Sequence, residues 1–253
     1  SCLMNIGIRE FLIITKETDL SNYKRLLGNG EQWGIVIKYK TQKKANGIPE
    51  AFIIAKDFIK NDNICLNLGD HILFGKKLNK YIIKNINKYS KNIIFSIKTK
   101  TPKDYGVLIR DKDGEPIKIV EKPNFFVSNE AVCGLYFYKN DIIQQSKNLK
   151  FSKRKEYEIT DVNNKFIKNK NLHVVSLDKS NYWYDAGDFE RINIISNLIK
   201  KLSLKKIFVG YPEHIALKNN FISMNNYKKI IKLYDNVEYS KNLNFLKDID
   251  ESY

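Results

Sequence analysis

Strand-like and helix-like segments alternate along most of the chain, and this alternation is the strongest constraint on its fold. Apolar runs such as "WGIVIKYKTQ" and "NDNICLNLGD" read as strands, and the Lys- and Asn-rich stretches between such runs read as amphipathic helices. From residue 92 to 138 the pattern changes, because strand-like segments follow one another with a turn at Asp113-Gly114. The sequence therefore predicts a doubly wound α/β fold whose mixed sheet carries an antiparallel insertion.

The length of 253 residues is enough for one sizeable core and a small appendage. No internal repeat or low-complexity linker interrupts the chain. Short amphipathic segments follow residue 210, around "YPEHIALKNNF" and "NNYKKIIKLYDN". We therefore expect a core domain over residues 1–205 and a helical C-terminal appendage over residues 206–253.

The formal net charge of +16 raises the question of nucleic-acid binding, because a basic balance is typical of proteins that bind polyanions. Only five of the 44 basic residues are arginine, the side chain that makes bidentate contacts to bases and phosphates. The lysines are spread along the whole chain among Asn and Ile. This pattern disfavours nucleic acid as a partner and suits small anionic substrates.

Neither a membrane nor an oxidising compartment is indicated. No apolar run approaches the roughly 20 residues of a membrane-spanning helix. The three cysteines lie far apart, and an odd number does not make a secreted disulfide framework. We expect a cytoplasmic protein that does not insert into membranes.

Two aspartates stand at positions where ligands bind in α/β proteins. Asp70 follows a strand-like run and Gly69, and Asp185 lies in "YWYDAGD" between three aromatic residues and the next helix. Ligands of open α/β sheets sit outside the carboxyl ends of strands. Two such carboxylates can share one Mg²⁺ with substrate phosphates, although each alone is also typical of a cap or a turn.

Two further short motifs carry groups that suit a sugar phosphate. Glu121 and Lys122 end a strand before Pro123, so the carboxylate can accept from sugar hydroxyls while the ammonium neutralises a phosphate. In "DYGVLIRD", the missing side chain of Gly106 next to Tyr105 would let a ligand lie against the backbone. An exposed strand end and an ordinary hairpin are the alternatives.

Many ordered stretches together resemble the glucose-1-phosphate thymidylyltransferases, a bacterial family of sugar nucleotidyltransferases, along essentially the full chain. They include "GIREFLIIT", "YKRLLGNGEQWGI", "LGDHILFG", "EKP", "AVCGLYFY", "YEITDVN", "WYDAG" and "YPEHIALKNNFIS". The resemblance implies a Rossmann-like nucleotidyltransferase fold. It also implies a Mg²⁺-dependent reaction of dTTP with glucose 1-phosphate, which yields dTDP-glucose and pyrophosphate for dTDP-rhamnose and cell-surface polysaccharide synthesis.

The resemblance further implies a cytoplasmic homotetramer. Another sugar nucleotidyltransferase that uses UTP or CTP, and a non-catalytic fragment that binds sugar nucleotide, stay open as alternatives. Phosphoryl transfer needs positioning and charge neutralisation more than a covalent nucleophile, which agrees with the residues present.

The family's motifs also assign roles to individual residues of this chain. By match to them, Asp70 and Asp185 would hold the metal, and Lys122 would meet the sugar phosphate. The remaining matches bind substrate: Gln42 and Gly47 at the base, His71 beside the metal, and Tyr105, Gly106, Glu121, Val132 and Glu158 around the sugar.

The chain departs from the family in three places. His71 stands where the family usually has Asn, and a neutral imidazole can still form hydrogen bonds. Ile48, Pro49 and Glu50 replace the usual Leu-Ala-Gln, which leaves the base and sugar contacts of this loop open. The family's opening strand and its Gly-Gly-x-Gly-Thr-Arg-Leu loop are not in the sequence, so we expect a fragment of a longer gene product that is inactive without them.

Overall fold

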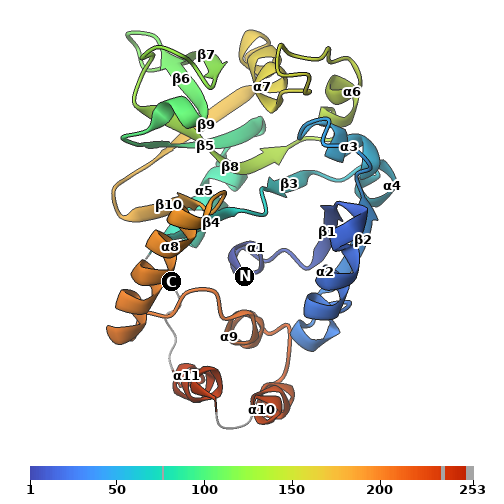
Figure 1. Cartoon of the computed structure of the whole chain (residues 1–253), viewed down its shortest axis with the longest axis vertical. Coiled ribbons are helices and arrows are strands. Elements are labelled where there is room, and N and C mark those ends of the chain that lie inside the picture. Colours follow the sequence, from blue (N-terminus) through green and yellow to red (C-terminus); the bar gives the residue numbers. More distant parts are fainter. Residues whose placement is uncertain (76, 235–236, 249–253) are drawn as a thin grey trace. The chain divides into compact units, whose positions relative to one another are not determined.

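The computed structural model describes residues 1–75, 77–234 and 237–248, and the chain divides into two compact units. Unit 1 comprises Ser1–Thr41, Leu73–Ile83 and Tyr184–Tyr253, and unit 2 comprises Gln42–Ile72 and Lys84–Trp183. Figure 1 labels the helices and strands of both units. The expected division at residue 205 stays a prediction.

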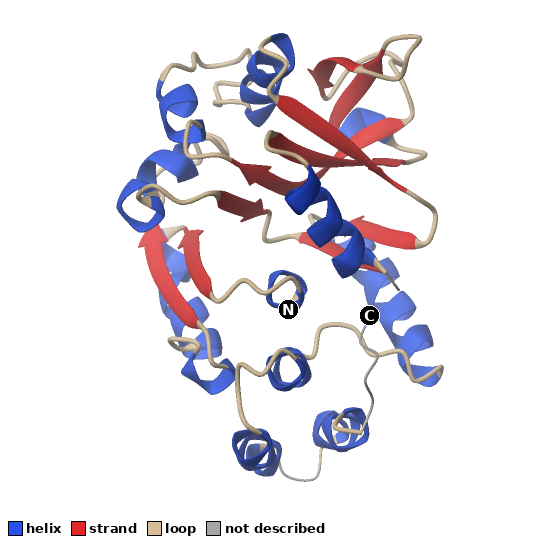
Figure 2. Cartoon of the chain, turned by 180° about the vertical axis from the view of Figure 1, so that it is seen from behind, coloured by secondary structure: helices blue, strands red, loops and turns tan. Residues whose placement is uncertain are grey.

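Unit 2 is built around one mixed sheet (Figures 1 and 2). Strand β8 pairs antiparallel with β3, β5 and β6, and β6 pairs antiparallel with β7. Strand β9 joins the far side of β5 in parallel. The predicted mixed sheet with an antiparallel block is confirmed. The strands are β3 (Ile64–Asn67), β5 (Asn92–Lys98), β6 (Gly106–Arg110), β7 (Pro116–Glu121), β8 (Glu130–Tyr138) and β9 (Leu172–Leu177).

Helix α7 (Ile159–Lys168) packs on this sheet through its asparagines as well as its apolar face. Asn164 exchanges two hydrogen bonds with the backbone of Ile119 in β7, at 2.7 and 2.8 Å. Asn163 accepts a hydrogen bond from the buried Tyr138 hydroxyl at 2.7 Å. These three hydrogen bonds fix the position of α7 along the sheet. The other helices of unit 2 are α3 (Glu50–Ile54), α4 (Lys56–Ile59), α6 (Ile142–Lys147) and a 3₁₀ turn at Pro102–Asp104.

Unit 1 joins the N-terminal segment to the C-terminal helices. Strands β1 (Glu10–Thr15) and β2 (Val36–Thr41) pair in parallel. Apolar side chains from both ends of the sequence form one core, including those of Met4, Trp33 and Leu243. The helices are α1 (Cys2–Asn5), α2 (Leu20–Leu27), α8 (Phe189–Leu204), α9 (Pro212–Lys218), α10 (Met224–Leu233) and α11 (Glu238–Leu246). The predicted helical C-terminal region is confirmed.

A buried carboxylate ties the helices of unit 1 together. Glu213 of α9 is 1% exposed and accepts hydrogen bonds from the Trp33 indole (3.1 Å) and the hydroxyls of Tyr234 (3.2 Å) and Tyr239 (2.5 Å). A buried polar group is tolerated when hydrogen-bond partners satisfy it. Figures 1 and 2 show α9, α10 and α11 beside one another, which agrees with these contacts.

Three elements run from one unit into the other: β4 (His71–Gly75), α5 (Leu78–Lys88) and β10 (Asn181–Asp185). Strands β4 and β10 pair in a two-stranded sheet. The sequence pattern placed Asp185 at the end of a strand before a helix, which β10 confirms, but it did not predict β4. The apolar run before Asp70 reads as a strand that ends at this acid, whereas in the structure a second strand, β4, begins directly after Asp70 and has a different partner.

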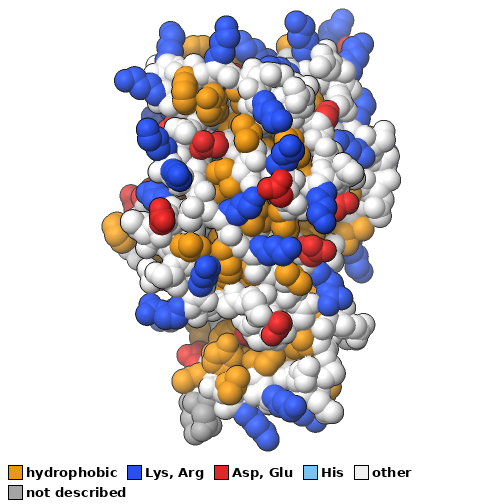
Figure 3. Space-filling model, turned by 90° about the vertical axis from the view of Figure 1, so that its right-hand side faces the viewer, with side chains coloured by type: hydrophobic (Ala, Val, Ile, Leu, Met, Phe, Trp, Pro, Cys, Tyr) orange, Lys and Arg blue, Asp and Glu red, His pale blue; other side chains and the backbone are white. Residues whose placement is uncertain are grey.

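Charged side chains do not gather on the face drawn in Figure 3, where lysine and arginine are interspersed with acidic and apolar side chains. Within the residues that the structure describes, no helix has both the length and the apolar character needed to cross a membrane.

The sheet of unit 2 also contains a polar network centred on Glu130 of β8. Arg110 donates two hydrogen bonds to its carboxylate, at 2.8 and 2.9 Å, and Ser96 and Ser176 donate one each, at 2.6 and 2.8 Å. Burial raises the pKa of Glu130, but these hydrogen bonds outweigh burial and bring the pKa down to about 2.

We therefore predict a pH-dependent contribution of Glu130 to stability. Its pKa is lower in the folded state than the ordinary 4.5, so the stabilisation is present above pH 4.5 and is lost as the pH falls toward 2. Glu130→Gln should lower the free energy of unfolding by about 2 kcal/mol at pH 7. At pH 3 the difference from wild type should shrink to roughly half.

Urea denaturation at both pH values measures this difference. Glu17→Gln, an exposed change in the 3₁₀ turn at Glu17–Asp19 of unit 1, serves as the control and should be neutral at both. An equal loss for Glu130→Gln at pH 7 and pH 3 would contradict the prediction.

Candidate functional site

Three aromatic rings of unit 2 lie in a row. The rings of Tyr105 and Trp183 are 4.6 Å apart, and those of Trp183 and His71 are 5.3 Å apart, both in edge-to-face orientation. Trp183 comes from β10, and Tyr105 follows the 3₁₀ turn at Pro102–Asp104. The predicted residues Tyr105 and His71 are thus brought together by a tryptophan that sequence reasoning treated only as packing.

The proton of His71 is fixed on one ring nitrogen. The backbone N–H of Gly134 and the indole N–H of Trp183 both donate to Nδ1, at 2.9 and 3.1 Å. An imidazole nitrogen that accepts hydrogen bonds carries no proton, so the neutral ring holds its proton on Nε2. In this tautomer His71 is a hydrogen-bond donor at Nε2 and offers no lone pair there to a metal.

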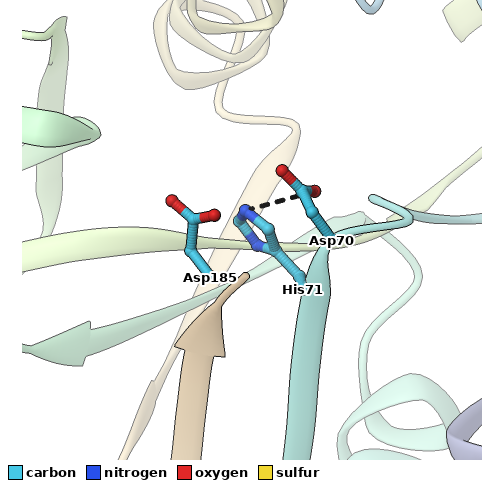
Figure 4. A group of neighbouring side chains, drawn as sticks. All are labelled: Asp70, His71 and Asp185. Atoms are coloured by element: carbon cyan, nitrogen blue, oxygen red, sulfur yellow. Dashed lines mark ion pairs between the residues drawn. The ribbon is translucent and has the colours of Figure 1, made fainter. Parts of the chain in front are cut away.

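Gly134 is needed for this arrangement, because a Cβ at that position would overlap the His71 imidazole. The Nε2 atom of His71 lies 3.9 Å from Oδ1 of Asp70, as the dashed line in Figure 4 marks. Asp70 occupies the turn between β3 and β4, and half of its side chain is exposed. Its carboxylate is therefore open to a ligand.

Asp185, also drawn in Figure 4, belongs to unit 1 and ends β10. Its Oδ1 accepts a hydrogen bond from the backbone N–H of Gly187 at 2.8 Å, and its Oδ2 pairs with Arg191 on α8. Arg191 also pairs with the helix-capping Asp188 at 3.1 Å. Within unit 1 the Asp185 carboxylate thus has a fixed orientation at the start of α8.

Glu121 and Gly106 face each other across β6 and β7. A Cβ on Gly106 would lie 3.2 Å from the Thr160 hydroxyl and 3.4 Å from Oε2 of Glu121, and Thr160 itself donates to Glu121. A side chain at position 106 would therefore crowd Ile119, Thr160 and Glu121, so the close packing around Glu121 favours glycine here. Burial raises the pKa of Glu121, and the hydrogen bond from Thr160 opposes the rise.

Lys122 has a strained backbone, with a φ of 39° that non-glycine residues rarely adopt. Its N–H donates to the carbonyl of Tyr105 at 3.0 Å, and Pro123 follows it. Strained backbone of this kind costs about 1–3 kcal/mol and clusters at functional sites. Strand β7 ends at Glu121, and Lys122 directly after it is exposed.

Arg154 connects the two acids of this region. Its guanidinium lies 3.5 Å from Glu121 and 3.4 Å from Glu158. Glu158 directly precedes α7, is 8% exposed and also accepts a hydrogen bond from the Ser152 hydroxyl at 2.8 Å. The predicted pocket acids Glu121 and Glu158 therefore share one cation.

The loop at Gln42 and Gly47 is tied to the segment before Glu158. The N–H of Tyr157 donates to the carbonyl of Asn46 at 2.7 Å, and Gly47, with a φ of 111°, packs so closely on the Tyr157 backbone that a Cβ would overlap it. Gln42 donates to the carbonyl of Gly47 at 3.2 Å. The loop conformation thus requires glycine at position 47.

Unit 2 alone carries all but one of the predicted site residues. His71 and Tyr105 meet through Trp183, Gly106 contacts Glu121, and Glu121 and Glu158 meet through Arg154. Val132 lies in β8 beside a register shift and is 6% exposed. Asp185 is described within unit 1 alone.

Sequence reasoning missed four residues that organise this region: Trp183, Gly134, Arg154 and Thr160. Arg154 could have been singled out from the sequence, because arginine is rare in this lysine-rich chain and its use at one position suggests a specific partner.

The chain is similar to known nucleotidyltransferases in sequence and in structure. Residues 1–201 match the family model described as nucleotidyl transferase. A glucose-1-phosphate thymidylyltransferase of Mycolicibacterium smegmatis is 37% identical over 88% of this chain and 77% of that protein. The enzyme of the same name from Neisseria meningitidis is 33% identical over 96% of this chain and 85% of that protein.

Two solved structures extend the comparison. A Bacillus anthracis structure assigned to the glucose-1-phosphate thymidylyltransferases matches with a TM-score of 0.72 and 29% identity, over 83% of this chain and 82% of that one. A UDP-glucose pyrophosphorylase matches with a TM-score of 0.68 and 23% identity, over 79% and 84% of the two chains, and so shares the fold. The chain belongs to the nucleotidyl transferase family, and its relatives there include the glucose-1-phosphate thymidylyltransferases.

Proposed function

We propose that the protein joins the nucleotidyl group of dTTP to glucose 1-phosphate, forming dTDP-glucose and releasing pyrophosphate. The names of the relatives, which are 33–37% identical over most of the chain, support this substrate pair. The single structural observation that carries the proposal is the group formed by Glu121, Lys122 and Tyr105. It places a carboxylate, an ammonium side chain and an aromatic ring around one turn of unit 2.

In the proposed reaction an oxygen of the sugar phosphate attacks the α-phosphorus of dTTP. The bond from that phosphorus to the oxygen bridging to the β-phosphate breaks, and pyrophosphate leaves. Lys122 neutralises the sugar phosphate, whose oxygens would otherwise repel the triphosphate. Glu121 and Glu158 accept hydrogen bonds from sugar hydroxyls, and Arg154 holds both carboxylates in place. Tyr105, Gly106 and Val132 form the walls of the sugar site, and Gln42 and Gly47 meet the base.

Mg²⁺ is the proposed cofactor, held by Asp70 and Asp185. Mg²⁺ prefers oxygen ligands and is commonly bound by one or two carboxylates plus substrate phosphates. The exposed carboxylate of Asp70 fits this preference, and each oxygen of Asp185 keeps a lone pair beyond its present partner. The metal would neutralise charge on the reacting phosphates. His71, with its proton on Nε2, would donate to a substrate oxygen and not bind the metal.

The remaining parts of the proposal rest on resemblance to the family. They are a cytoplasmic homotetramer with Mg²⁺, and a place in dTDP-rhamnose and cell-surface polysaccharide synthesis. Pyrophosphate release from dTTP and glucose 1-phosphate by the full-length gene product tests the central claim.

The first prediction from the proposed function concerns the metal ligands. Asp70→Asn and Asp185→Asn should each lower kcat by about 100-fold, because the reacting phosphates lose charge neutralisation. Steady-state pyrophosphate release across a Mg²⁺ titration measures the effect. Asp113→Asn, in the exposed turn between β6 and β7, is the control and should behave as wild type. Wild-type rates for both variants at saturating Mg²⁺ would refute shared metal binding.

The second prediction concerns the base. The side chain of Gln42 suits the edge of a pyrimidine, so kcat/KM should be highest for dTTP and lower for UTP, with ATP and GTP poor substrates. Equal kcat/KM values for dTTP and the purine nucleotides would show that the base is not recognised in this way.

The third prediction separates stability from activity at Lys122. Lys122→Gly should raise the free energy of unfolding by about 0.5–1 kcal/mol, because glycine adopts a φ of 39° without strain. The same change should raise KM for glucose 1-phosphate, since the ammonium group is lost. Lys122→Ala keeps the backbone strain and should show only the second effect. A stabilised Lys122→Gly with unchanged KM would exclude the proposed phosphate contact.

A further inference from the structure

The amide group of Gln42 is held by two acceptors. Its Nε2 lies 2.6 Å from Oε2 of Glu50 and 3.2 Å from the carbonyl oxygen of Gly47. A carboxylate and a backbone carbonyl accept hydrogen bonds and donate none, so only the NH₂ end of the amide can face both. Both N–H groups of Gln42 are thereby used within the protein, and its Oε1 faces the other way as an acceptor.

Glu50 is itself fixed by a second amide. Nδ2 of Asn46 donates to its Oε1 at 3.0 Å, so each oxygen of the carboxylate has its own donor. The carbonyl of Asn46 in turn accepts from the N–H of Tyr157. Hydrogen bonds thus join three parts of unit 2, namely the loop from Gln42 to Gly47, Glu50 at the start of α3, and the segment before Glu158.

We propose that Glu50 is a positioning residue that makes the protein prefer bases with a ring N–H, which among pyrimidines are thymine and uracil. The inference rests on the proposed function, in which Gln42 meets the base. Thymine and uracil carry a hydrogen on N3, which can donate to Oε1 of Gln42. Cytosine has a lone pair on N3 instead, so two acceptors would oppose each other, and a buried polar atom without a partner weakens binding.

A merely structural role for Glu50 predicts something different. Loss of its hydrogen bonds would loosen the loop and weaken all nucleotides alike. Selection by a fixed amide changes the ratio between dTTP and dCTP, which have the same charge and the same triphosphate. The ratio of the two dissociation constants is therefore the quantity to measure, and partial unfolding does not alter it.

Three substitutions separate these roles. Glu50→Leu removes the acceptor, so Gln42 can turn over, and the preference for dTTP over dCTP should fall about tenfold. In Glu50→Gln the new carbonyl oxygen can still accept from Gln42, and the Asn46 amide can turn over to accept from the new NH₂ group. This variant should therefore keep the wild-type ratio of the dTTP and dCTP dissociation constants. Glu50→Lys offers only donors, so Oε1 of Gln42 turns toward it and the preference should shift furthest toward dCTP.

Titration calorimetry of the full-length gene product with dTTP and dCTP gives both constants, and thermal unfolding checks each variant. Glu115→Gln is the control for an unrelated loss of negative charge. A Glu50→Leu variant that binds both nucleotides more weakly but keeps the wild-type ratio overturns the inference. The inference is also overturned if Glu50→Gln loses the preference for dTTP over dCTP as fully as Glu50→Leu does. The negative charge of Glu50, and not its role as a hydrogen-bond acceptor, would then set the preference.

Failure of the proposed function has a different signature. Wild-type protein would then release no pyrophosphate from dTTP and glucose 1-phosphate. If that reaction occurs with a preference for dTTP over dCTP, the Glu50 variants test the positioning role alone.

Discussion

The pairing of β8 with three other strands is the constraint on which the organisation of unit 2 depends. A strand in this position has its backbone groups committed along most of its length, so its residues have fixed places. Gly134, within β8, donates its N–H to Nδ1 of His71, and the Trp183 indole donates to the same atom. The tautomer of His71, and with it the direction of its donor toward Asp70, therefore follows from the position of one glycine in the central strand.

The few arginines of the chain stand at positions where one side chain holds an acceptor through hydrogen bonds or an ion pair. Arginine is a planar fork of five donors, whereas lysine is a point charge, and this chain uses lysine almost everywhere else. Arg110 holds Glu130, Arg154 lies between Glu121 and Glu158, and Arg191 pairs with Asp185. Arg9 donates twice to the carbonyl of Gly34. Four of the five arginines thus fix an acceptor that the fold or the proposed site requires.

Local patterns predicted most of the secondary structure because the periodicity of apolar residues is local information. The predicted turn at Asp113-Gly114 is confirmed, because β6 and β7 flank it. Strand β4 was missed because its identity depends on which strand it pairs with, and its partner β10 lies more than 100 residues later. The same distinction between local and long-range information applies to the candidate site. Family motifs named Glu121, Lys122 and Glu158, but the contacts of Thr160 and Arg154 with Glu121, and that of Trp183 with His71, join residues far apart in sequence.

The two tryptophans of the chain fall one to each compact unit. Trp33 is 8% exposed and hydrogen-bonded to Glu213 in the core of unit 1, whereas Trp183 lies against His71 and Tyr105 in unit 2. Indole emission depends on the polarity around the ring and on nearby quenching groups. The native protein thus carries two separate optical reporters, one of the buried helical core and one of the proposed substrate site. A Trp183→Phe variant would isolate the first, and its difference spectrum from wild type would isolate the second, without any attached dye.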